Sequence, residues 1–317
     1  MLNVMRTTFL LAALTGLFMV IGFVVGGQTG IVLALGFSIV INAIAYWNAG
    51  KLVLRLQNAQ RLDPRRAPDL FDMVDVLSKR AGIPSPQIFL IQTDQPNAFA
   101  TGRNPENSVV AVSTGLLNSL EPHEVAAVIA HEMAHIRSHD TLTMTITATL
   151  AGAISMLAQF GLFFGSRSPS NPLGPVGSII LIIFAPLAAV LVQMAISRTR
   201  EYEADRDSAQ ITGDPLALAT ALEKLSKLAR NFENPLARRN PGMAHLYIVN
   251  PLAGRGADNL FSTHPDVQNR IAALEQIARE MSVKPKREVW VVNSGSSWRV
   301  PIVKQSDVKN TSTGPWG

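Results

Sequence analysis

Two histidines and a glutamate lie within five consecutive residues, His131-Glu132-Met133-Ala134-His135. The surrounding segment is rich in alanine, valine and isoleucine and is expected to be helical. Because residues four apart lie on one face of a helix, the two imidazoles can converge on one Zn²⁺. Glu132 would then reach the fourth coordination position, where it could accept a proton from a water molecule. This H-E-x-x-H pattern therefore predicts a catalytic metal centre.

A buried helix with two structural histidines is the alternative interpretation. Glu132 argues against it, since an ionisable side chain in an apolar run needs a partner or a task. His139 continues the four-residue spacing, but eight residues of helix extend about 12 Å, so His131 and His139 cannot share an ion. We therefore predict His131 and His135 as the ligands and expect His139 at the surface or around the site.

A third ligand is expected further along the chain, because two histidines and a water leave one position of a tetrahedral site. The run Glu201-Tyr202-Glu203-Ala204-Asp205-Arg206-Asp207 contains two overlapping E-x-x-x-D pairs. Glu201 and Asp205 share a helical face with small residues, whereas the face of Glu203 is expected to be solvated. Glu201 is the predicted ligand, and Asp205 could accept the outer N–H of a ligating histidine. A charged helix with surface ion pairs is the alternative.

The composition indicates a membrane protein. Of the 317 residues, 47% are hydrophobic and only 16% are charged, whereas about a quarter are charged in a typical soluble domain. The absence of cysteine excludes disulfides and thiolate ligands and leaves histidine and carboxylate to bind a metal. The net charge of +5 comes with basic residues beside apolar segments, which favours anchoring at a membrane over nucleic-acid binding. No Walker A pattern is present, so no ATP site is expected.

Four apolar segments are long enough to cross a bilayer. Thr7 to Val25 and Ile31 to Trp47 predict a retained helical hairpin, with a cleaved signal peptide as the alternative. Leu142 to Phe164 and Val176 to Ile196 form a second pair, with two buried soluble helices as the alternative. Lysine and arginine at the ends of these segments predict that both termini and the H-E-x-x-H segment are cytoplasmic, with residues 166–175 on the other side.

The remaining segments predict helices and a small sheet. Three short β-prone runs suggest an antiparallel sheet: Ile88–Ile91, Asn97–Thr101 and Ser108–Ser113. Helices are expected over Pro68 to Ala81, Asp214 to Phe232 and Pro265 to Met281.

Several separate motifs resemble, in order, those of the HtpX-type membrane metallopeptidases, which are related to the CAAX prenyl endoproteases. H-E-M-A-H is followed by an apolar hairpin and by S-R-T-R-E-Y-E-A-D, Ser197 to Asp205. Ala81 to Pro86, Pro96 to Gly102 and Ser262 to Ile271 also match, so the resemblance covers nearly the whole chain. It implies an inner-membrane, zinc-dependent endopeptidase that helps to degrade misfolded membrane proteins as part of a stress response.

The resemblance also suggests how substrate binds. The N-A-F of a substrate-binding edge strand in thermolysin-like peptidases is similar to Asn97, Ala98 and Phe99. We expect this strand to have an unpaired edge on which an extended peptide pairs, with an ordinary inner strand as the alternative. His264 and Arg270 lie in the last matching motif and are candidate substrate-binding residues. A helix-capping, structural role is the alternative for Arg270.

Together these features predict a mainly α membrane protein with about four transmembrane helices and a cytosolic, zincin-like α+β catalytic domain. We divide the chain into residues 1–50 (first hairpin), 51–140 (sheet and H-E-x-x-H helix), 141–197 (second hairpin), 198–303 (third ligand) and 304–317 (a tail expected to be disordered).

The predicted centre holds one Zn²⁺ through His131, His135 and Glu201, with Glu132 as general base. The expected partners are unfolded membrane proteins and the lipid bilayer. A CAAX-type protease and a non-catalytic membrane scaffold or metal sensor are the alternatives. Four spans argue against the first, and the presence of Glu132 argues against the second.

Overall fold

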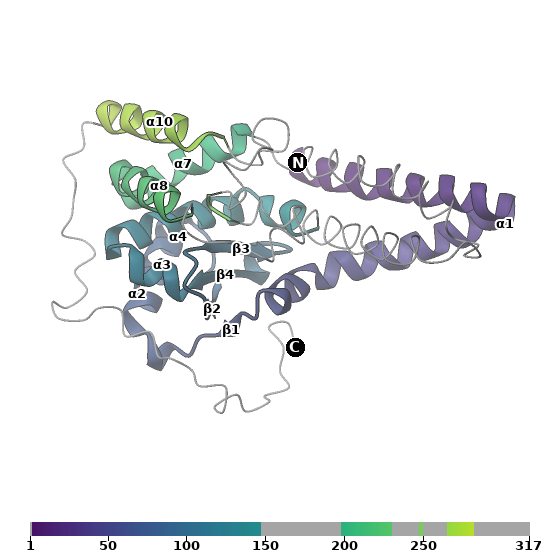
Figure 1. Cartoon of the computed structure of the whole chain (residues 1–317), viewed down its shortest axis with the longest axis horizontal. Helices are drawn as coiled ribbons and strands as arrows, with labels where there is room; N and C mark the ends of the chain where they lie inside the picture. The colour runs from purple at the N-terminus through teal and green to yellow at the C-terminus, as the bar shows by residue number, and fades with distance from the viewer. Residues whose placement is uncertain (1, 147–197, 230–246, 250–264, 282–317) are drawn as a thin grey trace, which may run out of the picture.

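The computed structural model describes residues 2–146, 198–229, 247–249 and 265–281. A long helical hairpin projects from a body in which helices stack on one side of a small sheet (Figure 1). Most of the predicted second hairpin and all of the predicted tail lie outside the described residues. The elements in chain order are α1 (Leu2–Leu56), β1 (Gln60–Arg61), η1 (Pro64–Arg66), α2 (Pro68–Ala81), β2 (Gln87–Ile91), β3 (Ala98–Gly102), η2 (Pro105–Asn107), β4 (Ser108–Ser113), α3 (Thr114–Ser119), α4 (Pro122–Arg137), α7 (Arg198–Thr212), α8 (Pro215–Ala229) and α10 (Val267–Glu280).

The element α1 turns back on itself at Gly26 and Gly27, whose backbone angles are not helical. Gly27 has a φ of 60°, in the left-handed region that glycine adopts without a steric penalty. The two arms run side by side in Figure 1, and Asn42 Nδ2 donates a hydrogen bond of 2.9 Å to Thr15 Oγ1 across them. The break predicted between the first two apolar segments lies at this turn.

The outer surface of the hairpin is apolar. Its exposed large side chains include Phe9, Val20, Phe23, Val32, Leu33, Phe37, Ile39, Val40 and Ile44. Within the described ranges, Gly26–Ile44 is the one helical segment that is long and apolar enough to cross a membrane. The other three expected spans stay predictions.

The sheet has the strand order β1-β2-β4-β3 and is mixed. Strand β4 pairs antiparallel with β3 but parallel with β2. The prediction of an antiparallel sheet is therefore wrong for the central pair, β2 and β4. After β2 the chain forms β3 at the end of the sheet, one strand position beyond its neighbour. It then turns back, and β4 lies between β2 and β3. Strand β3 is therefore the last strand of the sheet among the described residues, as predicted for an edge strand. The short strand β1, which pairs with β2, was not predicted.

Helix α4 is the centre of the body. It lies between the sheet and the helices α7 and α8, and α10 packs on α7 and α8 in turn (Figure 1). Its residues from Val125 to Ala130 have no exposed surface. The other face of the sheet packs on the end of α1, where Val53 and Leu54 belong to the same buried apolar cluster as Phe99. Helix α2 has the predicted limits, and α8 and α10 lie within theirs.

Two glycines bring the arms of the hairpin together, and this contact can be tested. A Cβ atom added at Gly30 would overlap the backbone of Gly22, whereas a Cβ at Gly36 on the same arm would meet nothing within 4 Å. We expect Gly30→Ala to destabilise the purified protein by about 1–3 kcal/mol, the usual cost of overpacking. Gly36→Ala is the matched control and should be neutral or slightly stabilising. Thermal unfolding in detergent measures both, and equal midpoints would contradict the close packing of the arms.

Candidate metal centre

Helix α4 carries the H-E-x-x-H residues, and its start is well defined. Pro122 occupies the first turn, where its missing N–H leaves no hydrogen bond unmade. The carboxylate of Glu124 accepts a hydrogen bond of 2.8 Å from the backbone N–H of Glu121 and another of 2.8 Å from Lys224 of α8. The second of these contacts holds the start of α4 against α8.

The second element of the site is α7. Glu201, Ala204, Asp205 and Ser208 are all buried, whereas Glu203 is exposed. The face of α7 that carries Glu201 is therefore buried, as expected, and the choice of Glu201 as the ligand stays a prediction. Ser208 Oγ donates a hydrogen bond of 2.7 Å to the carbonyl oxygen of Ala127, and this bond fixes the distance between α7 and α4.

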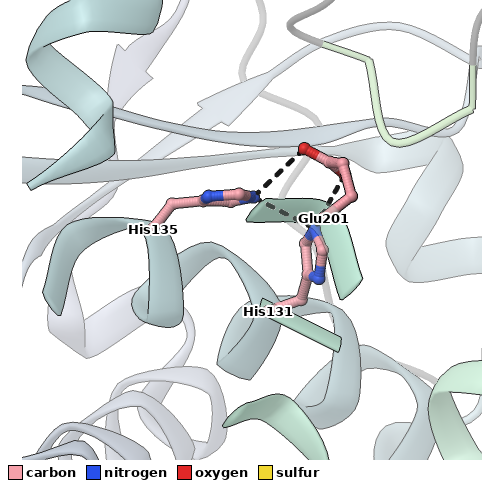
Figure 2. Close-up of side chains that lie close together, drawn as sticks. All are labelled: His131, His135 and Glu201. Atoms are coloured by element: carbon pink, nitrogen blue, oxygen red, sulfur yellow. Dashed lines mark hydrogen bonds and ion pairs between the residues drawn. The ribbon is translucent and has the colours of Figure 1, made fainter. Parts of the chain in front are cut away.

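The side chains of His131, His135 and Glu201 point toward one another (Figure 2). All three are buried, and one ligand atom from each lies within 4.8 Å of the other two. The two Nε2 atoms are 3.3 Å apart. The nearest carboxylate oxygens of Glu201 lie 3.7 Å from His131 Nε2 and 3.6 Å from His135 Nε2.

These separations fit a metal ion. Ligand atoms at about 2.0–2.2 Å from a tetrahedral Zn²⁺ lie about 3.3–3.6 Å from one another. Two imidazoles and a carboxylate are also the set of donors found in catalytic zinc sites with an open position. The three residues can therefore hold a divalent cation with little movement.

Behind His131, Asp205 and Arg270 form a buried ion pair. His131 Nδ1 lies 3.0 Å from Asp205 Oδ1. Arg270 of α10 donates two hydrogen bonds to Asp205, of 2.8 Å from Nε and 2.6 Å from Nη2. Its Nη1 also lies 3.6 Å from Glu201 Oε2. The guanidinium group is fully buried and engaged, which favours a positioning role for Arg270 over direct contact with substrate.

These charges shift several pKa values. Burial lowers the pKa of His131, but the carboxylates of Asp205 and Glu201 outweigh burial and raise it to about 9. Burial raises the pKa of Asp205, yet Arg270 and His131 hold it below the ordinary value. A cation that takes Nε2 of His131 therefore displaces a proton, whereas Asp205 stays ionised.

Behind His135, a second buried ion pair was not predicted from the sequence. His135 Nδ1 lies 3.3 Å from Asp140 Oδ2, and Arg200 Nη1 donates a hydrogen bond of 2.8 Å to Asp140 Oδ1. Burial raises the pKa of Asp140, but His135 and Arg200 bring it below the ordinary value. One feature of the sequence could have indicated this pair. Asp140 stands immediately before a long uncharged segment, where a charged side chain needs a partner.

Glu132 lies between the two histidines and reaches the edge strand. Its Oε2 accepts a hydrogen bond of 2.8 Å from the backbone N–H of Ala100 in β3. The side chain is buried, with 7% of its surface exposed. The carboxylate is thus held beside the ligand cluster and oriented by the strand predicted to bind substrate.

The other candidate substrate-binding residues lie in or beside β3. Asn97 accepts a hydrogen bond of 3.3 Å from the backbone N–H of Ile248 through its side-chain oxygen, which ties this strand to a distant segment. Ala98 packs in the core on the α4 side of the sheet, and Phe99 packs on the opposite side. His264 lies outside the described residues. His139, predicted for the surface or around the site, is exposed just after α4 ends.

Comparison with known proteins identifies the family. The model of peptidase family M48 matches residues 64–278, a range that includes every described residue of the candidate site. The chain belongs to this family. The metallopeptidase resemblance drawn from the sequence motifs is thereby confirmed. A crystal structure of Ste24p from S. mikatae is similar at 20% identity with a TM-score of 0.48, over 86% of this chain and 65% of that chain. This M48 chain therefore spans less than two thirds of the length of that protein.

The two faces of α7 give a direct test of the ligand set. Glu201→Ala removes one of three converging donors, and we expect zinc affinity to fall by more than the about 10–100-fold that is usual for an outer partner. Glu203→Ala is the matched control, two residues away on the exposed face, and should bind zinc as the parent does. Metal analysis of both purified variants measures the difference. Loss of zinc in Glu203→Ala instead would reverse the assignment.

Proposed function

We propose that this M48 protein is a membrane-anchored zinc endopeptidase that hydrolyses peptide bonds of unfolded membrane proteins. The observation that carries the proposal is the position of Glu132, which is held by the edge strand beside three buried, converging metal donors. A structural metal site requires no free carboxylate at this place, whereas hydrolysis requires a base there. The site is proposed to hold one Zn²⁺ through His131, His135 and Glu201.

When bound, Zn²⁺ would polarise the scissile carbonyl and make a water molecule more acidic. Glu132 is then in position to accept the proton of the attacking water and to transfer it to the leaving amine. The N–H of Ala100 keeps one carboxylate oxygen fixed during this transfer. Asp205, 3.0 Å from Nδ1 of His131, would orient that ring for metal binding.

Substrate backbone is proposed to pair along β3. Asn97 makes both of its backbone hydrogen bonds with Ser113, at 2.8 Å and 2.9 Å, on the inner side of the strand. Because backbone groups alternate along an antiparallel strand, those of Ala98 point to the outer side. Pairing through backbone groups depends little on substrate side chains, which suits a protease that acts on many unfolded sequences.

The membrane location is proposed from the hairpin. Its exposed phenylalanine, valine and leucine side chains make an apolar surface that water does not favour and that lipid would cover. Basic residues flank the apolar segments on the side of the catalytic body, which suggests the inner membrane with the catalytic body in the cytoplasm. A site close to the bilayer would meet damaged membrane proteins first, which supports a role in protein quality control.

The proposed base can be tested by Glu132→Gln. This change keeps the shape of the side chain but removes the base, so peptide hydrolysis should fall by at least about 10²-fold. Zinc content should stay at the parent level, because Glu132 is not a ligand. Cleavage of casein and metal analysis are measured on the same preparation. Loss of zinc, or cleavage at the parent rate, would refute the assigned role, and a parent protein that binds zinc but cleaves nothing would favour a scaffold or sensor.

The proposed substrate strand can be tested by Ala98→Pro. Proline removes an outward N–H and leaves the hydrogen bonds to β4 intact, so KM for casein should rise while zinc content is unchanged. Thermal unfolding serves as the control for folding. Normal cleavage by a folded variant would show that substrate binds elsewhere, and an unfolded variant would favour the inner-strand alternative.

The proposed topology can be tested in a chain without natural cysteine. A cysteine at Ser168 should react with an impermeant maleimide in intact cells. A cysteine at Ser138, which is exposed at the end of α4, should react only after the cells are permeabilised. The reverse pattern would place the catalytic body on the outside.

A further inference from the structure

Asp140 lies at the point where the chain leaves the metal centre. It follows the end of α4 by three residues and begins the helical residues 140–146. Its side chain is buried and contacts two partners, His135 through Oδ2 at 3.3 Å and Arg200 through Oδ1 at 2.8 Å. Arg200 lies immediately before Glu201, so the chain returns to the site at this residue.

The two histidines have matching surroundings. His131 is backed by Asp205, which is held by Arg270, and His135 is backed by Asp140, which is held by Arg200. The first carboxylate comes from α7, the helix of the third ligand. The second comes from the short segment that follows the end of α4, and it lies outside the E-x-x-x-D pattern. Each imidazole is therefore held through the nitrogen that faces away from the ligand cluster.

We propose that Asp140, fixed by Arg200, is a positioning residue that orients His135 for metal binding. A carboxylate at Nδ1 favours the tautomer with the proton on that nitrogen, which leaves the lone pair of Nε2 directed at the metal. The hydrogen bond from Arg200 Nη1 to Asp140 Oδ1 holds the carboxylate in place beside the ring of His135. The inference rests on the metal site of the proposed function and adds a residue pair to it.

The same ion pair joins the two ends of residues 141–199. A simple closing contact between the ends is the alternative, and it would affect folding without affecting the metal.

Asp140→Asn separates these two roles. The amide keeps the size of the side chain and one acceptor oxygen but loses the charge, so Zn²⁺ affinity should fall by about 10–100-fold. The absorption spectrum of the Co²⁺-substituted protein should also change, since it reports ligand geometry. Arg200→Ala should change both readouts in the same direction but less, because Arg200 acts through Asp140. The full-length protein in detergent is stripped of metal and titrated with Zn²⁺ against a chromogenic chelator.

Arg137→Ala is the matched control. Arg137 forms an ion pair with Asp207, which also links the end of α4 to α7 but contacts no proposed ligand. This variant should keep the parent affinity and cobalt spectrum.

The outcomes distinguish a failure of the role of Asp140 from a failure of the zinc site itself. Parent-like zinc affinity and cobalt spectrum in Asp140→Asn would overturn the inference, even if thermal stability falls. If Asp140→Asn does not fold, Arg200→Ala decides by the same two readouts. If the parent protein itself binds no Zn²⁺, the proposed function fails first.

Discussion

The carboxylate of Asp205 joins three helices around one buried charge. It contacts His131 of α4, belongs to α7 and accepts two hydrogen bonds from Arg270 of α10. An unpaired charge at this depth would be strongly destabilising, so each partner is needed where it is. The relative positions of α4, α7 and α10 are therefore constrained by electrostatics as well as by apolar packing. Glu201, a candidate metal ligand, lies beside this ion pair, 3.6 Å from Arg270 Nη1.

The sheet contributes a second constraint through its edge. Strand β3 places the N–H of Ala100 on the carboxylate of Glu132, and the end of α1 covers the opposite face of the same strand. The strand thus connects the hairpin to the proposed general base. An edge strand that already supports Glu132 can align a peptide beside it without a separate binding domain.

Much of the candidate site could be predicted because it depends on the spacing of residues within single helices. Positions four apart on a helix share a face, so the pairing of His131 with His135 and the choice of Glu201 over Glu203 follow from spacing and from neighbouring small residues. The limits of α2 follow from proline and glycine at its ends. The direction of β2 relative to β4 could not be predicted, because the sequence pattern of a short buried strand is the same in both directions.

By itself, the sequence determined the donor types, their helical faces, the apolar segments and the membership in family M48. The tertiary structure alone decided the strand order and the pairing of Asp140 with Arg200, which are 60 positions apart. It also decided that Arg270 pairs with Asp205, 65 positions away. The physical reason is that a buried charge requires a partner, while its own sequence neighbourhood does not specify which distant residue the fold brings to it.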